Sequence, residues 1–137
     1  MADCVRVERE SAMPKVLIVD DERSLRTLYQ RELEREGYEV LCASTAREGL
    51  ELIESQLPDV LVLDIRMPGM DGLEALARTL DQHPQLPVIL NTAYSCYKDD
   101  FLSWGADAYL VKSADLTELM ATIRSLAPAS GSATSSS

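Results

Sequence analysis

Cysteine and histidine are scarce in this chain of 137 residues, which contains three cysteines and one histidine. The cysteines, Cys4, Cys42 and Cys96, are odd in number, far apart and without the C-x-x-C spacing of zinc or redox sites. We therefore expect no disulfide framework, and the single His83 argues against a metal site built on imidazoles. The cysteines are interpreted as buried or incidental thiols in a reducing cytoplasm.

Basic charge and long apolar runs are also lacking. The chain has 13 basic and 23 acidic residues and a net charge of −10, which argues against a surface for nucleic acid or anionic lipid. No apolar run approaches the roughly 20 residues of a membrane span, and residues 1–14 contain no signal-peptide core. These absences predict a cytoplasmic protein that binds neither nucleic acid nor membranes directly.

Composition divides the chain into three parts. Residues 1–13 mix charges and predict a flexible arm. Residues 127–137 contain only Ala, Pro, Ser, Gly and Thr, which predicts a disordered tail or a linker stub. Residues 14–126 are left as one folded domain of ordinary size.

Short apolar runs alternate with longer amphipathic segments through this domain. The runs predict five strands and the segments five helices, the helix between the last two strands being the weakest. Gly37 stands where a helix C-cap belongs, and Asp115-x-x-Glu118 has the pattern of an N-terminal capping box. The expected strands are 15–19, 38–42, 59–63, 86–90 and 108–111, and the expected helices are 22–36, 46–56, 73–81, 98–104 and 115–126.

This (βα)₅ alternation predicts a parallel sheet with helices on both faces and right-handed crossovers. The first and third strands are the most apolar and should be central, whereas the second and fifth are mixed and should lie at the edges. The predicted fold is therefore a flavodoxin-like, doubly wound α/β sheet with strand order 2-1-3-4-5. Ligands of such sheets bind beyond the carboxyl ends of the strands.

Polar residues follow four of the five predicted strands at this edge. Three carboxylates converging after neighbouring strands repel one another and favour a bound cation, and a purely oxygen donor set favours Mg²⁺. Asp64 would then be the nucleophile for a phosphoryl group whose charge is stabilised by Thr92 and Lys112. Each feature alone has a simpler explanation, such as a helix N-cap or a surface lysine, but their shared edge favours one site. The residues are Asp20 and Asp21 after the first strand, Asp64 after the third, Asn91-Thr92-Ala93 after the fourth and Lys112 after the fifth.

Four sequence blocks resemble the receiver domain of two-component response regulators over about residues 15–126. They are Val16-Leu-Ile-Val-Asp-Asp-Glu22, Leu61-Val-Leu-Asp-Ile-Arg-Met-Pro-Gly-Met-Asp-Gly72, Thr92-Ala93 and Gly105-Ala-Asp-Ala-Tyr-Leu-Val-Lys112. The resemblance implies a phosphorylation-biased, two-state switch, not a classical enzyme. It also implies a sensor histidine kinase or phosphotransfer protein as donor and a downstream protein as target.

The resemblance also assigns roles to residues. Asp64 resembles the phosphoacceptor, and Mg²⁺ (or Mn²⁺) would be held by Asp20 or Asp21, Asp64 and the backbone carbonyl of Arg66, with Asp21 the more direct of the pair. Thr92 resembles the switch hydroxyl that moves toward the phosphate. Tyr109, on the last predicted strand, resembles the aromatic residue that turns inward when the hydroxyl moves.

Two further expectations concern the surroundings of the site. Arg66 and Tyr94 occupy positions that tune phosphate lifetime in similar domains, and their bulk predicts a long-lived phosphoryl group. The family usually has proline, joined by a cis peptide, after the lysine. Here Ser113 follows Lys112, and a cis bond to a non-proline residue costs about 3–4 kcal/mol. We predict a trans bond and a rearranged loop, which puts the reach of Lys112 in question.

Aromatic residues cluster in one short segment before the last strand. Tyr97, Phe101 and Trp104 share a helical stripe, which predicts that at least two of them pack on the sheet. If some are exposed, they would form a partner face or a homodimer face.

Three alternative functions were weighed. A haloacid dehalogenase-type phosphatase needs a second aspartate two residues after the nucleophile, where this chain has Arg66. A flavodoxin-like electron carrier needs a phosphate-binding loop where Asp20, Asp21 and Glu22 would repel the flavin phosphate. A receiver-like protein-binding module that works without phosphorylation stays open because of the altered Lys112-Ser113 loop.

Overall fold

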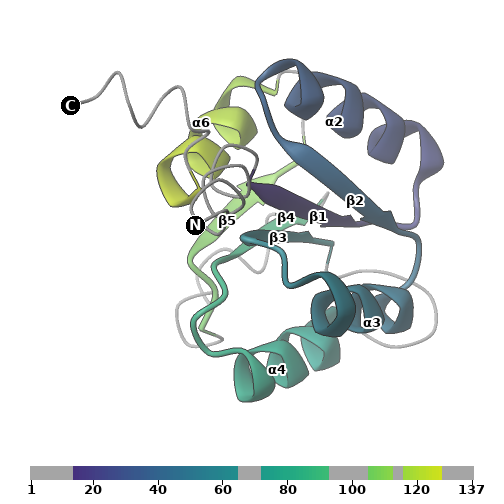
Figure 1. Cartoon of the computed structure of the whole chain (residues 1–137), viewed down its shortest axis with the longest axis vertical. Coiled ribbons are helices and arrows are strands. Elements are labelled where there is room, and N and C mark those ends of the chain that lie inside the picture. Colours follow the sequence, from purple (N-terminus) through teal and green to yellow (C-terminus); the bar gives the residue numbers. More distant parts are fainter. Residues whose placement is uncertain (1–13, 65–71, 93–104, 113–115, 128–137) are drawn as a thin grey trace, which may run out of the picture.

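The computed structural model describes residues 14–64, 72–92, 105–112 and 116–127. The strands are β1 (Lys15–Val19), β2 (Glu39–Ala43), β3 (Val60–Leu63), β4 (Val88–Thr92) and β5 (Ala108–Val111), and the helices are α2 (Arg23–Arg35), α3 (Ala46–Gln56), α4 (Gly72–Gln82) and α6 (Thr117–Leu126). Strands and helices alternate from β1 to β4, and β5 and α6 follow after the gap at residues 93–104 (Figure 1).

The five strands form one parallel sheet in the order β2-β1-β3-β4-β5, which confirms the predicted topology. The central strands β1, β3 and β4 are buried along nearly their whole length, because helices cover both faces. The edge strands β2 and β5 include exposed positions, as their mixed sequences predicted.

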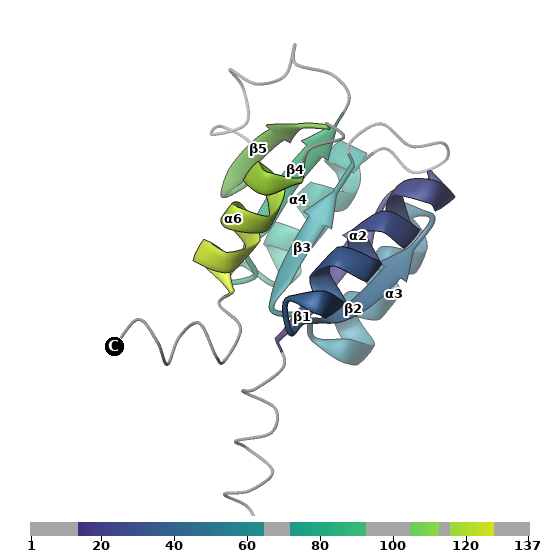
Figure 2. The same ribbon diagram turned by 90° about the horizontal axis from the view of Figure 1, so that it is seen from above.

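Helices α2 and α6 cover one face of the sheet, and α3 and α4 cover the other (Figures 1 and 2). Because successive residues of a strand point to opposite faces, each face has its own hydrophobic cluster. Leu17, Val19 and Leu63 pack with Ile53 of α3 and Leu76 of α4. The second cluster joins Val16, Ile18 and Val62 to Tyr29 and Leu33 of α2 and to Leu119 and Ile123 of α6.

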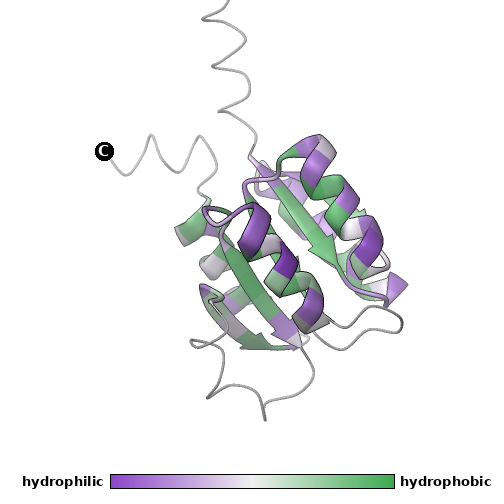
Figure 3. Ribbon diagram, turned by 90° about the horizontal axis from the view of Figure 1, so that it is seen from below, coloured by the Kyte–Doolittle hydropathy of each residue, from purple (hydrophilic) through white to green (hydrophobic). Residues whose placement is uncertain are grey.

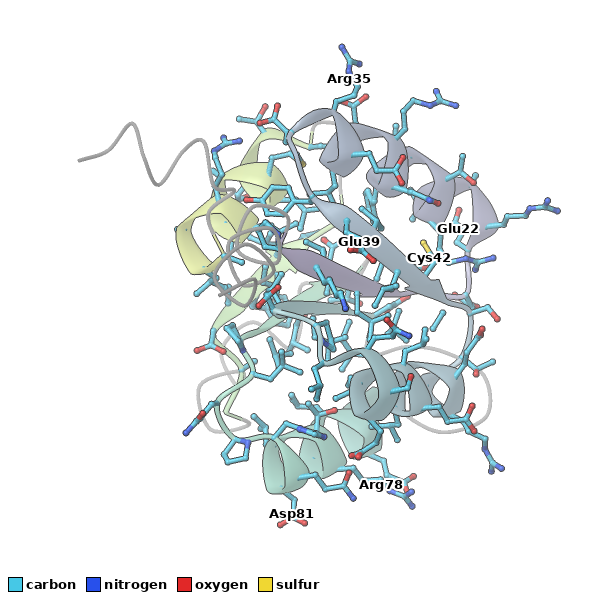
Figure 4. All side chains as sticks on the ribbon, in the orientation of Figure 1. Glu22, Arg35, Glu39, Cys42, Arg78 and Asp81 are labelled. Carbon is cyan, nitrogen blue, oxygen red and sulfur yellow. The ribbon has the colours of Figure 1, made fainter. Side chains whose placement is uncertain are left out.

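The helices are amphipathic, as their sequence periodicity predicted. The strands are coloured hydrophobic almost throughout, whereas each helix mixes hydrophobic and hydrophilic positions (Figure 3). Charged side chains such as Arg35 on α2 and Arg78 and Asp81 on α4 extend outward from the body (Figure 4). In the described part of the chain, every helix is too short or too polar to cross a membrane.

The position of β4 differs from the prediction of residues 86–90. The strand runs from Val88 to Thr92, so that Asn91 and Thr92 lie within it instead of following it. The reason is tertiary: Asn91 is paired with Leu110 and Thr92 with Val111 of β5, and this pairing outweighs the low strand preference of asparagine.

The start of α6 also differs from the predicted capping box. Leu116 is the N-cap residue, without a capping side-chain hydrogen bond, and Asp115 lies outside the described residues. At the other end, Ala127 is buried and its amide donates to the carbonyl of Ile123, although composition placed it in the tail. The predicted arm 1–13, the helix 98–104 and residues 128–137 lie outside the described part.

Gly37 ends α2 as the sequence predicted. Its φ is 97°, and its amide donates to the carbonyl of Glu34 at 3.1 Å. A residue with a Cβ is strained at this φ, whereas asparagine tolerates the left-handed region better than other non-glycine residues.

Replacing Gly37 with alanine is expected to lower the free energy of unfolding by about 1–2 kcal/mol, because alanine must adopt this strained conformation. The matched variant Gly37→Asn is expected to lose clearly less. Urea denaturation of the three proteins measures both effects. Equal stabilities of Gly37→Ala and the parent chain would show that the turn does not require glycine.

Candidate functional site

Two aspartates meet at the carboxyl edge of the sheet because β1 and β3 are adjacent and in register. Val19 is paired with Leu63, so the next residues, Asp20 and Asp64, leave the two strands side by side. The amide of Asp64 donates to the carbonyl of Val19 at 3.0 Å, which fixes this alignment one residue beyond the ladder. The register of two strands thus places both carboxyl groups in one site.

Asp21 adds a third carboxylate. One oxygen from each of Asp20, Asp21 and Asp64 can be chosen so that all three lie within 4.8 Å of one another. Asp20 and Asp64 are only 2% and 5% exposed, whereas Asp21 is exposed. Buried like charges at this separation need a cation, and three carboxylate oxygens form a hard donor set that suits Mg²⁺ or Mn²⁺. The residues present therefore fit a divalent ion.

Lys112, directly after β5, provides a cation from the chain itself. Its Nζ lies 2.8 Å from Asp20 Oδ2 and 2.9 Å from Asp64 Oδ2. Lys112 therefore reaches both carboxylates, which answers the question raised by Ser113. Burial alone would lower the pKa of Lys112, but the hydrogen bonds to Asp20 and Asp64 outweigh it and raise this pKa above its usual value. The ammonium group thus stays charged at neutral pH.

The two acidic residues after β1 are held differently. Asp20 Oδ1 accepts the amide of Glu22 at 2.9 Å, and its backbone carbonyl accepts Arg26 Nη1 at 2.8 Å. With Lys112 on Oδ2, both carboxylate oxygens of Asp20 are occupied by the protein. Asp21 is exposed, and it directly precedes Glu22, which Figure 4 labels at the start of α2.

Thr92 and Tyr109 lie on the face of the sheet that α3 and α4 cover. Thr92 is fully buried at the end of β4, and its carbonyl accepts the amide of Lys112 at 2.7 Å. Tyr109 is paired with Leu90, two residues before Thr92, and is buried in the same cluster. The aromatic side chain predicted to turn inward thus occupies a buried position in this structure.

Several predicted residues lie outside the described part of the chain. These are Arg66, Ala93, Tyr94, Tyr97, Phe101, Trp104 and Ser113. The carbonyl ligand, the lifetime-tuning pair, the aromatic stripe and the Lys112–Ser113 peptide bond therefore remain predictions.

Sequence analysis assigned no role to Asn91, whose side chain lies on the opposite face from Thr92. Asn91 Nδ2 donates to the hydroxyl of Tyr29 on α2 at 3.0 Å, and both side chains are buried. The signal available was its place directly after a buried apolar run, because a buried asparagine requires a polar partner. The partner could not be identified, since Tyr29 is 62 residues away and shares its helical face with leucines.

A hollow of about 430 Å³ lies at the other edge of the sheet. Its lining includes Leu57, Pro58, His83 and Pro87, which precede β3 and β4 or end the neighbouring helices. The amino ends of the strands carry no cluster of potential metal ligands among the residues described. Among the described residues, the cluster of potential metal ligands therefore lies at the carboxyl edge.

Comparison with known sequences gives a consistent result. The model of the response regulator receiver domain matches residues 16–124. The alkaline phosphatase synthesis transcriptional regulatory protein PhoP of Bacillus subtilis is 38% identical over 82% of this chain and 48% of its own length. The transcriptional regulatory protein AfsQ1 of Streptomyces coelicolor is 39% identical over 83% of this chain and 51% of its own length. The chain thus spans about half the length of these curated relatives.

Solved structures agree with the sequence relatives. The response regulator protein TrrA of Thermotoga maritima, in complex with Mg²⁺-BeF, aligns with a TM-score of 0.79 at 41% identity, covering 83% of this chain and 99% of TrrA. TrrA in complex with the histidine kinase ThkA aligns with a TM-score of 0.77, covering 83% of this chain and 98% of that chain. From its sheet, its acidic edge and these matches, the chain belongs to the response regulator receiver domain family.

Proposed function

We propose that this chain is a phosphorylation-activated switch in which Asp64 accepts a phosphoryl group from a phosphohistidine. The donor is a sensor histidine kinase or a phosphotransfer protein, as the complex of the relative TrrA with the kinase ThkA suggests. The observation that carries the proposal is the contact of Lys112 with both Asp64 and Asp20, because it places a nucleophile, a metal-ligand candidate and a charge-neutralising group at one point.

In the proposed transfer, an Asp64 carboxylate oxygen attacks the phosphorus atom. The P–N bond to the imidazole breaks, its electron pair stays on the ring nitrogen, and that nitrogen takes up a proton. The Lys112 ammonium and the Thr92 hydroxyl donate hydrogen bonds to the negatively charged oxygens of the transferring group as the Asp64 oxygen gives up its charge to form the new O–P bond. The product is an acyl phosphate on the protein itself, so the chain undergoes one transfer and acts as a phosphoacceptor, not as a turnover enzyme.

The divalent ion, Mg²⁺ or Mn²⁺, would be held by Asp21, Asp64, Asp20 and the backbone carbonyl of Arg66. When bound, it neutralises charge on the transferring group. Asp21 is the more direct ligand of the pair, since its side chain is exposed whereas both oxygens of Asp20 already accept hydrogen bonds from the protein. The Mg²⁺-BeF complex of the relative TrrA supports a divalent ion as the cofactor.

The switch would act through Thr92 and Tyr109. Movement of the Thr92 hydroxyl toward the phosphate leaves space that favours the inward position of Tyr109, and the altered surface binds a downstream protein. Arg66 and Tyr94 would restrict access of water to the acyl phosphate and extend its lifetime. The acidic net charge of −10 favours a protein partner over direct nucleic-acid binding, and we place this exchange in the cytoplasm.

Mg²⁺ is expected to stabilise the chain, because ligand binding to the folded state alone shifts unfolding. At 100 times the dissociation constant the gain is about 2.7 kcal/mol. Thermal unfolding with increasing MgCl₂ measures it. Asp64→Asn should lose most of this gain, whereas Glu39→Gln, an exposed carboxylate at the start of β2, should keep it. An equal Mg²⁺ response in both variants would contradict a site at Asp64.

Phosphoramidate, which carries a P–N bond, is expected to phosphorylate the chain in the presence of Mg²⁺. Intact-mass analysis should show a gain of one phosphoryl group, about 80 Da. Asp64→Asn and a sample without Mg²⁺ should show none. A failure of the parent chain to gain mass, with circular dichroism confirming its fold, would favour the phosphorylation-independent binding module.

Removing the Thr92 hydroxyl is expected to slow phosphorylation. A hydrogen bond to a charged group contributes about 1.5–3 kcal/mol, so Thr92→Val should react about 10- to 100-fold more slowly with phosphoramidate. Thr92→Ser keeps the hydroxyl and should stay within a fewfold of the parent rate. Equal rates of the valine and serine variants would remove Thr92 from the transfer step.

A further inference from the structure

Among the described residues, the last two residues of β4 lie beyond the positions paired with β3. Pairing with β3 ends at Leu63 and Leu90, whereas pairing with β5 continues through Asn91 and Thr92. Within the described residues, the ladder partners of Asn91 and Thr92 are those of β5. Contacts from the two faces of the sheet add to this pairing in holding the end of β4.

Asn91 supplies such a contact on the opposite face. Strand alternation directs Thr92 to the face of α3 and α4 and Asn91 to the face of α2 and α6. Asn91 is 3% exposed, Tyr29 is 1% exposed, and the Asn91 amide donates to the Tyr29 hydroxyl at 3.0 Å. Burial raises the pKa of Tyr29, so its hydroxyl stays protonated at neutral pH.

Helix α2 is anchored to β1 as well. Arg26, one turn before Tyr29, donates to the carbonyl of Asp20 at 2.8 Å. The same helix thus contacts the end of β1, which carries Asp20, and the end of β4, which carries Thr92. Thr92 in turn accepts the amide of Lys112. The Tyr29–Asn91 bond therefore links the acidic side of the site to the side that carries Thr92 and Lys112.

Packing does not require these two polar side chains. They sit in a cluster that is otherwise apolar, and two apolar residues of similar shape would give comparable stability without a buried hydrogen bond. A cavity of about 290 Å³ adjoins the pair, so both side chains have space beside them. The hydrogen bond is thus a directional contact between α2 and the end of β4.

We propose that Tyr29 and Asn91 are positioning residues of the phosphoacceptor site: their hydrogen bond holds the end of β4, and with it Thr92 and Lys112, in place against Asp20 and Asp64. The effect on phosphoryl transfer rests on the proposed function. The effect on the position of β4 and Lys112 is a property of the fold and can be measured without phosphorylation.

The test compares Tyr29→Phe, Asn91→Leu and the double variant. Each single change leaves one buried polar group without its partner and should lower the urea midpoint, whereas the double variant removes both groups and should recover most of the loss. If the bond is purely structural, Lys112 amide exchange and the phosphorylation rate should recover together with stability in the double variant. A positioning bond predicts that site properties stay altered in the double variant.

Two readouts distinguish these cases. Hydrogen exchange of the Lys112 amide, which donates to Thr92, should be about tenfold faster in the double variant even after its stability has recovered. The rate with phosphoramidate at saturating Mg²⁺ should fall about tenfold, while Mg²⁺ affinity changes less than about twofold because β1 and β3 keep their register.

Thr79→Val is the matched control. Thr79 is buried, and its hydroxyl donates to the carbonyl of Ala75 within α4, so this variant also removes a buried hydrogen bond. Thr79→Val should lower the free energy of unfolding. Exchange of the Lys112 amide should become faster only by the amount that this loss of stability explains, and the phosphorylation rate per folded molecule should stay the same.

The outcomes separate the two proposals. A double variant with parent-like stability, Lys112 exchange and phosphorylation rate overturns the positioning role. If the parent chain takes up no phosphoryl group, the proposed function fails, and Lys112 exchange alone decides whether Tyr29 and Asn91 position the end of β4. If the double variant does not fold, Tyr29→Phe, which removes a single oxygen, is compared with Thr79→Val by the same readouts.

Discussion

The ammonium group of Lys112 between Asp20 and Asp64 is the contact on which the arrangement of the site depends. The register of β1 and β3 forces two carboxylates together, and burial removes most of the water that would screen their repulsion. Lys112 offsets that repulsion only because β5 is the neighbour of β4 and brings the residue that follows it to the same edge. Lys112, which is far from both aspartates in the sequence, thus offsets the repulsion between the two carboxylates.

One lysine does not balance three carboxylates. With Asp21 included, the cluster keeps an excess of negative charge after the contacts of Lys112 are counted. Such an excess costs stability and creates affinity for a divalent cation, a common compromise at functional sites. The hydrogen bonds from the Glu22 amide and Lys112 that hold Asp20 limit this cost without removing the charge.

Much of this architecture follows from local sequence patterns. Apolar runs located β1, β3 and β5 within one residue, and the contrast between wholly apolar and mixed strands gave the strand order. Because ligand sites of such sheets lie beyond the carboxyl ends of the strands, the sequence also predicted that Asp20, Asp64, Thr92 and Lys112 lie together. These features could be predicted because each depends on a short segment and on the common direction of parallel strands.

Features that depend on tertiary partners were missed. Pairing with β5 extends β4 through Asn91, which its own residues do not favour. The Tyr29–Asn91 bond joins a helix residue to a strand residue 62 positions away, so the sequence around one does not identify the other. The N-cap position of α6 is Leu116 and not Asp115, so the local capping pattern did not locate the start of this helix.

The separation of the site residues along the chain has a consequence for synthesis and folding. Lys112 and Asp64 are 48 positions apart, and the Tyr29–Asn91 bond spans 62. Contacts of this range form only after the intervening chain has been made and the sheet has closed. A nascent or partly unfolded chain therefore exposes Asp64 without its cation. Under the proposed function, acceptance of a phosphoryl group by Asp64 is confined to molecules that have completed their fold, so that reactivity would also report folding quality.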